Sequence, residues 1–312
     1  MNESIGDRRA RIEGGLVGLL VGDALGVPYE FHPPQSIPPR AEIEYTPPTG
    51  FARAHYGTPP GTWSDDGALA LALLDSLLSG GGLDPTDLGQ RLLARRDKGA
   101  YAVDGRVFDI GAQTARALSA IRSGIPPLQA GSTEEHALGN GSLMRVLPLT
   151  LWSGAPDGDL VTDAMNQSRL THGHLRAQVC CALYCLWARR TLDGRSHSWS
   201  EAVDTLRGMW PESGPERAEL EFHIRTDDAP AGKGSGYVVD TLRSARWAVE
   251  TTATFEDAVR AAISLGNDTD TTACVAGGIA GLRHGVSAIP DRWRTSLRGQ
   301  EILTPLRDAL LG

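Results

Sequence analysis

The sequence predicts an all-α fold, and three observations support this prediction. Apolar residues recur at helical spacing wherever the chain is periodic, glycines recur at four-residue steps in two segments, and few alternating runs of β-branched residues compete with these patterns. A length of 312 residues would allow two domains, but it also suits one large helical unit with a continuous core. Length alone therefore leaves the number of domains open.

The first predicted helix covers residues 13–25 and carries a strip of glycines on one face. A second strip lies near the C-terminal end of the chain. The glycines are Gly14, Gly18, Gly22 and Gly26 in the first strip and Gly277, Gly281 and Gly285 in the second. Each glycine inside a helix costs about 1 kcal/mol, which close packing of two backbones would have to offset. We therefore expect the two strips to pack against each other.

Further helices follow from apolar spacing and from residues typical of helix ends. They span residues 67–79, 86–96, 110–123, 160–166, 175–190, 237–250, 254–265 and 303–310. Two connectors, residues 28–61 and 227–236, are too rich in proline and glycine for regular structure. Loops of this length in a compact protein more often carry function than not, although a flexible surface insert remains the alternative.

Charge and composition exclude several classes of protein. Lys and Arg total 30 against 38 Asp and Glu, so an acidic chain of net charge −8 is a poor partner for nucleic acid or anionic lipid. No secretory apolar region follows the N-terminal charges, and Asp23 interrupts the most apolar early stretch. The 4 cysteines match neither a disulfide framework nor a metal motif. We expect a cytoplasmic protein with buried thiols and no membrane segment.

Two acidic clusters stand directly before apolar helical runs. The first is Ser64-Asp65-Asp66, and the second contains Asp268, Asp270 and Thr271. Capping of the helix N-termini explains one carboxylate or hydroxyl in each cluster. Adjacent carboxylates that converge in a buried place, however, need a cation to offset their repulsion. Two matched clusters therefore favour a metal site over capping alone.

The side chains of these clusters are hard ligands. All six carry oxygen, without sulfur or imidazole, a set that suits Mg²⁺ or Mn²⁺ better than Zn²⁺. Two octahedral ions need more positions than six side chains fill singly. Bridging carboxylates, water and substrate hydroxyls would complete the coordination, so the site leaves room for a substrate.

Six segments of the chain carry a family resemblance. They are GLLVGDALGVPYEF, GTWSDDGALAL, GNGSLMRVLPL, THGHLRAQ, GSGYVVDTL and LGNDTDTTACVAGGIAGLRHG. Together they resemble the ADP-ribosylglycohydrolase family, which includes the dinitrogenase reductase-activating glycohydrolases. The resemblance implies a compact single-domain orthogonal helical bundle over residues 1–312, with two Mg²⁺ or Mn²⁺ ions in a cleft that binds ADP-ribose. It also implies hydrolysis of the bond between ADP-ribose and a modified protein side chain, with arginine as the default.

The motifs suggest roles for individual residues. Ser64, Asp65, Asp66, Asp268, Asp270 and Thr271 match the metal ligands of the family. Glu30 and Asp109 match carboxylates that lie beside the metals and the scissile bond, and Asp270 is expected to be indispensable for turnover. Without the motifs, Glu30 would be a solvated residue at a helix end and Asp109 a plain helix cap. Which of these two carboxylates activates water stays open.

The nucleotide-binding residues form a third group. Asn140, Gly141 and Ser142 can bring backbone N–H groups and short side chains against a pyrophosphate. The resemblance places His172 near the nucleotide, whereas a zinc pair formed with His174, the alternative, lacks a third ligand. Tyr237 is expected to stack in the adenosine region, with core packing as an equal alternative.

Two alternative functions remain open. One is a catalytically silent ADP-ribose-binding protein of the same fold, which the intact ligand set argues against. The other is a hydrolase of free ADP-ribose derivatives, which the same metals could serve. The expected partner is an ADP-ribosylated protein or an ADP-ribose derivative, and a monomer is the default oligomeric state.

Overall fold

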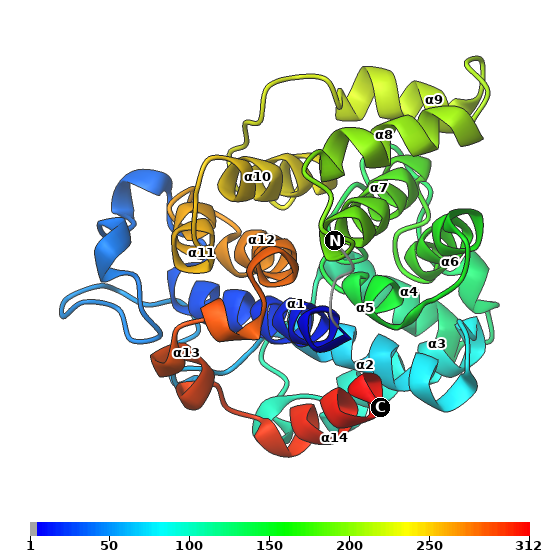
Figure 1. Ribbon diagram of the computed structural model, residues 1–312. Coiled ribbons are helices and arrows are strands. Elements are labelled where there is room, and N and C mark those ends of the chain that lie inside the picture. The colour runs from blue at the N-terminus through cyan, green and yellow to red at the C-terminus, as the bar shows by residue number, and fades with distance from the viewer. Residues whose placement is uncertain (1–4) are drawn as a thin grey trace.

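A computed structural model describes residues 5–312 and consists of helices joined by loops (Figure 1). The α-helices are α1 (Ile5–Gly26), α2 (Asp65–Gly80), α3 (Pro85–Lys98), α4 (Ala112–Arg122), α5 (Leu147–Trp152), α6 (Asp157–Arg169), α7 (Leu175–Leu192), α8 (Ser198–Met209), α9 (Pro215–Ala218), α10 (Val238–Glu250), α11 (Phe255–Ile263), α12 (Thr269–His284), α13 (Asp291–Ser296) and α14 (Gln300–Leu311). A π-helical turn, Glu219–Ile224, follows α9. Only two isolated β-bridges, and no strand, occur within this part of the chain. The all-α prediction is confirmed.

All the helices predicted from apolar spacing are present, with ends that differ by a few residues. The largest difference is at α1, which begins eight residues before the predicted start at residue 13. The prediction omitted α5, α8, α9 and α13. Three of these contain only 6, 4 and 6 residues, too few for a periodic pattern. Helix α8 did carry a signal, because Trp199, Ala202, Val203 and Leu206 follow helical spacing and are buried.

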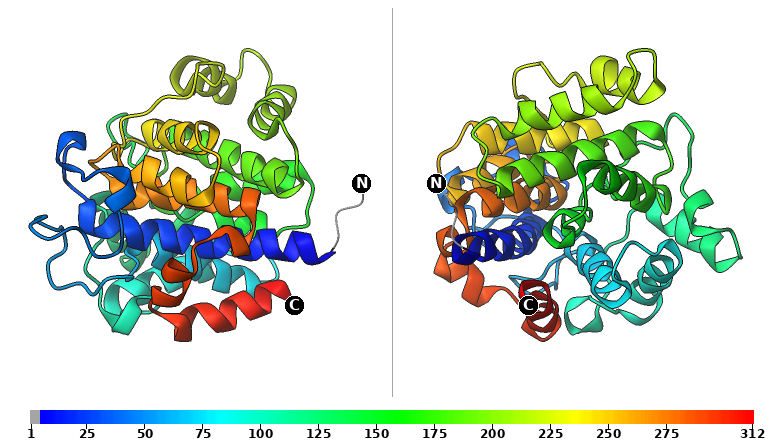
Figure 2. Two further views of the ribbon diagram at one scale, coloured as in Figure 1. Left: turned by 60° about the vertical axis from the view of Figure 1, so that its left-hand side comes forward. Right: turned by 45° about the vertical axis from the view of Figure 1, so that its right-hand side comes forward.

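Helices α1 and α12 form the centre of the fold, and α10 lies above α12 (Figure 2). Their glycine strips face each other, as predicted. A Cβ atom at Gly18 would lie 2.4 Å from the carbonyl oxygen of Gly277, and one at Gly22 would lie 2.1 Å from that of Ala273. A Cβ atom at Gly26 would lie 2.3 Å from the Cα atom of Asp270. The helices are therefore antiparallel, and the end of α1 meets the start of α12.

Asp23 of α1 holds the start of α2 near the place where the end of α1 meets the start of α12. Its carboxylate accepts hydrogen bonds from the backbone N–H groups of Ser64, at 2.9 Å, and Gly67, at 2.7 Å. It thus caps α2 from a neighbouring helix. A Cβ atom at Gly67 would lie 2.6 Å from the side chain of Leu20, so packing against α1 explains this glycine. Burial raises the pKa of Asp23 to about 7.

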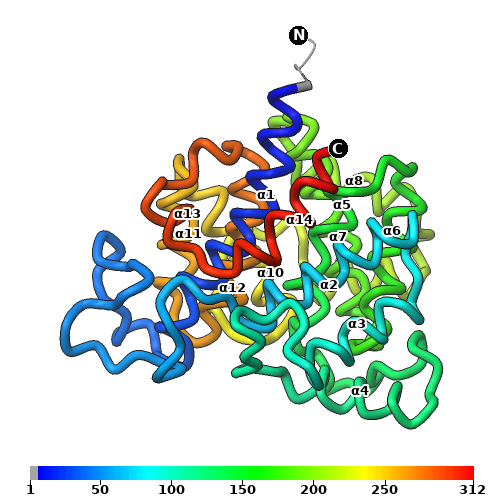
Figure 3. The backbone as a smooth tube through the Cα atoms, turned by 90° about the horizontal axis from the view of Figure 1, so that it is seen from below, coloured from blue at the N-terminus to red at the C-terminus, as the bar shows by residue number. Residues whose placement is uncertain are grey.

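The remaining helices surround this centre. Seen from below, α14 and α2 lie alongside α1 (Figure 3). One cluster of buried apolar side chains extends through the helices, and it includes Cys180, Cys181, Cys185 and Cys274, which are all unpaired as expected. None of the helices within residues 5–312 is both long enough and apolar enough to cross a membrane.

Candidate active site

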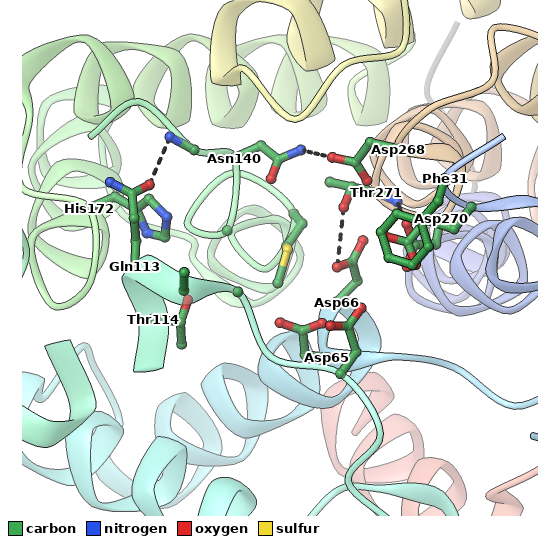
Figure 4. Close-up of a pocket in the computed structure, with 17 residues that line it drawn as sticks. Phe31, Asp65, Asp66, Gln113, Thr114, Asn140, His172, Asp268, Asp270 and Thr271 are labelled. Atoms are coloured by element: carbon green, nitrogen blue, oxygen red, sulfur yellow. Dashed lines mark hydrogen bonds between the residues drawn. The ribbon is translucent and has the colours of Figure 1, made fainter. Parts of the chain in front are cut away.

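A cleft of about 380 Å³ opens where the starts of α2, α4 and α12 meet the segment that follows α1 (Figure 4). Its volume is in the range of small-molecule sites. It is lined by Glu30, Phe31, Asp65, Asp66, Asp109, Gly111, Ala112, Gln113, Thr114, Gly139, Asn140, Gly141, Met144, His172, Asp268, Asp270 and Thr271. Most of the residues expected in the site therefore lie in one cleft, although they come from distant parts of the chain.

The two acidic clusters meet at one side of this cleft. Thr271 Oγ1 donates a hydrogen bond to Asp66 Oδ1 over 3.4 Å (Figure 4). Asp268 is the residue that precedes α12, and its Oδ2 accepts a hydrogen bond from Asn140 Nδ2 at 2.7 Å. Ser64 does not line the cleft, and its hydroxyl accepts from the backbone N–H of Asp66 at 3.3 Å, as an N-cap does.

The carboxylates of the two clusters are buried or half-buried close to one another. Burial, followed by repulsion from neighbouring carboxylates, raises the pKa values of Asp66 and Asp270 well above their usual range. Burial also raises the pKa of Asp65 to about 6 and raises that of Asp268. Asp66 Oδ2 is buried without a hydrogen-bond partner. A buried set of hard oxygen ligands with one orphaned carboxylate oxygen fits divalent cations such as Mg²⁺ or Mn²⁺.

Glu30 approaches the second cluster from the segment after α1. Its carboxylate and those of Asp268 and Asp270 offer oxygens that all lie within 4.8 Å of one another. Two backbone hydrogen bonds fix this approach, from Phe31 N to Asn267 O at 2.7 Å and from Asn267 N to His32 O at 2.6 Å. Glu30 is buried in the site and is not the solvated helix-end residue of the alternative interpretation.

His55 also lies in the site, a place that the sequence did not indicate. Its Nε2 lies 2.5 Å from Glu30 Oε2 and 4.0 Å from Asp109 Oδ2, between the two carboxylates expected to act in catalysis. Burial raises the pKa of Glu30 to about 7, against the lowering effect of the hydrogen bond from His55. That same hydrogen bond raises the pKa of His55. A lone histidine in a proline-rich loop gives no sequence signal for this contact.

Asp109 lines the cleft and does not cap a helix. Helix α4 begins at Ala112 with Gly111 as the preceding residue, and Asp109 Oδ1 instead accepts a hydrogen bond from the N–H of Ile110 at 2.7 Å. The helix expected to start at Ile110 thus starts two residues later. Its first turn lines the cleft through Ala112, Gln113 and Thr114, and the N-terminus of a helix favours an anion.

The opposite side of the cleft offers hydrogen-bond donors. Figure 4 shows Gln113, Thr114 and His172 on this side. Thr114 Oγ1 and Gln113 Nε2 are buried without hydrogen-bond partners, and both residues line the cleft. Burial lowers the pKa of His172 to about 3, so its ring is neutral at physiological pH. Nothing in the sequence indicated a role for Gln113 and Thr114 at the start of α4.

Two of the three residues expected to bind the nucleotide in the Asn140–Ser142 segment lie at the cleft. Asn140 and Gly141 line the cleft, and a Cβ atom at Gly141 would lie 2.8 Å from the ring of His172. Ser142 is fully buried behind the segment, and its hydroxyl accepts from Ser168 Oγ at 2.8 Å. Arg145, also buried, donates to the carbonyl of Gly141 at 3.1 Å and holds the segment from behind.

Tyr237 lies outside the cleft. It lines a neighbouring hollow on the far side of the segment at Gly139, to which it is joined by an isolated β-bridge. Its side chain is 37% exposed, and its hydroxyl lies 3.3 Å from Arg176 Nη1. The exposed ring is therefore not packed in the core.

Comparison with known proteins identifies the family of this chain. A sequence model of the family described as ADP-ribosylglycohydrolase matches residues 5–312. The chain belongs to the ADP-ribosylglycohydrolase family. It is thus a hydrolase of the ADP-ribosylglycohydrolase class, and the resemblance carried by its motifs is confirmed.

Individual members of the family are similar over nearly the whole chain. An ADP-ribosylarginine hydrolase, Tri1 of Serratia proteamaculans, is 32% identical over 96% of this chain and 78% of its own. An ADP-ribosyl-[dinitrogen reductase] glycohydrolase of Rhodospirillum rubrum is 29% identical over 92% of this chain and 90% of its own. A solved structure of an ADP-ribosylglycohydrolase-related protein complex is 33% identical, with a TM-score of 0.78 over 98% of both chains.

Proposed function

We propose that this member of the ADP-ribosylglycohydrolase family is a metal-dependent hydrolase that cleaves the bond between ADP-ribose and a modified arginine side chain of a protein. One observation carries the proposal: two acidic helix starts, 205 positions apart at Asp66 and Thr271, converge on one side of a cleft. The opposite side offers unpaired donors suited to phosphate. This polarity matches ADP-ribose, in which a negatively charged diphosphate joins the adenosine to the reactive distal ribose.

The proposed cofactors are two Mg²⁺ ions, with Mn²⁺ as the substitute. Asp65, Asp66, Asp268, Asp270 and Thr271 would hold them, and Ser64 would contribute the hydroxyl lone pair that its capping bond leaves free. Divalent ions at this place supply positive charge that orients the ribose hydroxyls and makes water more acidic. The raised pKa values and the unpartnered Asp66 Oδ2 support this assignment.

Glu30 and Asp109 are the proposed catalytic carboxylates. Either can accept a proton from the attacking water, because both lie at the cleft next to the acidic clusters. Their negative charges also stabilise the positive charge that develops on the ribose as the glycosidic bond breaks. His55 fixes the position of Glu30, which supports Glu30 as the residue with the more defined geometry.

Arginine linkage is proposed because the similar protein of Serratia proteamaculans is an ADP-ribosylarginine hydrolase. The substrate would then be an ADP-ribosylated protein. We further propose that the protein acts in the cytoplasm as a monomer, without nucleic-acid or membrane partners. Its acidic charge of −8 and its four unpaired, buried cysteines support this placement.

A three-substrate assay tests the proposed function. Hydrolysis of ADP-ribosyl-arginine, ADP-ribosyl-serine and free ADP-ribose derivatives is compared with excess Mg²⁺ and with a chelator. We expect release of ADP-ribose from the arginine substrate, which the chelator abolishes. Survival of every substrate, together with tight binding of ADP-ribose, would favour the silent binding protein. Cleavage of the free derivatives alone would favour the other alternative.

A further inference from the structure

Phe31 is an exposed aromatic residue at the edge of the cleft. Its side chain is 70% exposed, yet it lines the cleft directly after the buried Glu30. A large apolar side chain gains nothing from burial when it faces water. The packing of the core therefore does not explain a phenylalanine at this position.

The backbone of Phe31 is also in a conformation that disfavours this residue type. Its φ angle is +64°, in the left-handed region that suits glycine or asparagine. The paired hydrogen bonds with Asn267 hold it there. An exposed ring on a strained backbone at a cleft is the kind of outlier that points to a function.

The position of Phe31 indicates which part of a bound ligand its ring would contact. Figure 4 shows Phe31 and His172 on opposite sides of the opening, with Phe31 on the side of Asp270. If ADP-ribose binds with its phosphates at the donors on the His172 side, its distal ribose would lie on the carboxylate side. The group attached to that ribose would then leave the cleft beside Phe31.

The surroundings of the ring favour a planar cation. The His55 ring supports Phe31 at a centroid distance of 5.5 Å, and Phe108 contacts His55 in turn at 5.1 Å. The carboxylates of Glu30, Asp109 and Asp270 lie in the same cleft. A guanidinium is planar and stays charged, stacks on aromatic faces, and gains from nearby carboxylates. A serine linkage offers neither a flat face nor a charge.

We propose that the Phe31 ring is a platform on which the guanidinium of an ADP-ribosylated arginine stacks, so that Phe31 selects arginine linkages over neutral ones. This inference rests on the proposed function, because it presumes that the cleft holds ADP-ribose with its acceptor side chain. It adds to that function a residue and a contact that select which linkage is cleaved.

The test replaces the ring while keeping the backbone preference. Phe31→Asn removes the ring but tolerates a positive φ, and Phe31→Trp keeps an aromatic face. Phe222, which is 76% exposed in the π-helical turn after α9, supplies the matched control Phe222→Asn. For each variant, kcat/KM for ADP-ribosyl-arginine and for ADP-ribosyl-serine and the inhibition constant of ADP-ribose are measured.

We expect Phe31→Asn to lower kcat/KM for ADP-ribosyl-arginine by about five- to twenty-fold, the range of a partly desolvated cation–π contact. Binding of ADP-ribose and any activity on the serine substrate should stay within about two-fold, as a ring that contacts only the acceptor requires. Phe31→Trp and Phe222→Asn should resemble the wild type. An equal loss for ADP-ribosyl-arginine and ADP-ribose, or no loss for the arginine substrate, would overturn the inference.

Failure of the proposed function has a different signature. If the wild-type protein cleaves none of the substrates, that function is wrong, and calorimetry then measures binding of ADP-ribosyl-arginine against ADP-ribose. A weaker binding of the arginine ligand alone in Phe31→Asn would still support the platform. No binding of ADP-ribosyl-arginine by the wild type would overturn it.

Discussion

Thr271 Oγ1 donates a hydrogen bond to Asp66 Oδ1 over 3.4 Å, although the two residues are 205 positions apart in the chain. This contact joins the first turn of α2 to the first turn of α12. Both helices owe their placement to α1, which caps α2 through Asp23 and packs its glycines against α12. The acidic cleft is therefore a direct consequence of how three helices meet.

Replacing Asp270 with asparagine should abolish turnover while the fold survives. The substitution keeps the volume of the side chain but removes one of the charges that would attract a cation. We expect kcat to fall by about 1,000-fold or more and the affinity for Mn²⁺ to fall with it. Circular dichroism and titration calorimetry check the fold and the metal. Full activity in this variant would contradict a metal site at Asp270.

Asp66→Asn should change stability in opposite directions with and without metal. Because the folded state raises the pKa of Asp66, the protonated form stabilises the fold, and this contribution is lost as the pH rises above about 4. Asparagine cannot ionise. In chelator at pH 8, the variant should have a larger free energy of unfolding than the wild type, by on the order of 1–3 kcal/mol.

Excess Mg²⁺ should reverse this order, because the wild-type carboxylate would then bind a cation. Urea unfolding measures the free energy of unfolding of both proteins at pH 4 and pH 8, each with chelator and with Mg²⁺. The two proteins should be equally stable near pH 4, where both side chains are neutral. A less stable variant in chelator at pH 8 would mean that the charge of Asp66 is compensated within the protein.

His55→Ala should move the acidic limb of the pH–rate profile to higher pH. Glu30 must be ionised to accept a proton, and the hydrogen bond from His55 lowers the pKa of Glu30. Without this bond the pKa of Glu30 rises, so kcat/KM at pH 6 should fall by about three- to ten-fold relative to that at pH 9. His55→Gln keeps a donor and should shift less. An unchanged profile would indicate that Glu30 is not the base.

Gly22→Ala should disrupt the contact between α1 and α12. Its Cβ atom would lie 2.1 Å from the backbone oxygen of Ala273, where no side chain can move aside. We expect a loss of stability on the order of 3 kcal/mol and a loss of activity, because the end of α1 and the start of α12 bear the site. Gly208→Ala in α8 is the control, since its Cβ atom would meet open space and should stabilise the helix by up to about 1 kcal/mol. Equal unfolding midpoints would contradict the close packing.

Helices and the acidic clusters were predictable because their signals are local. Apolar residues recur at helical spacing within the longer helices. The glycine strips predicted that α1 and α12 pack against each other. The resemblance of the motifs then grouped Glu30, Asp109 and the two clusters, which the cleft brings together. The short helix α5 lacks enough residues for such a pattern.

Contacts made across the fold were not predictable. Asp23 in α1 caps α2, a contact that exists only once the two helices have come together. In the sequence alone, Asp23 is an acidic residue in an apolar stretch. His55 reaches Glu30 because a loop of irregular backbone turns back, with a φ angle of +48° at His55 itself. Ser142 directly follows the cleft residue Gly141 in the sequence, but the local backbone turns it away from the cleft. Tyr237 precedes α10 and lines a neighbouring hollow instead.

The starts of α2 and α12 are expected to hold divalent ions jointly. The most direct measurement is anomalous diffraction from crystals soaked in Mn²⁺. We predict two anomalous peaks in the cleft, each within about 2.5 Å of carboxylate oxygens from Asp65, Asp66, Asp268 or Asp270. Crystals with abundant Mn²⁺ but no peak among these carboxylates would contradict the account.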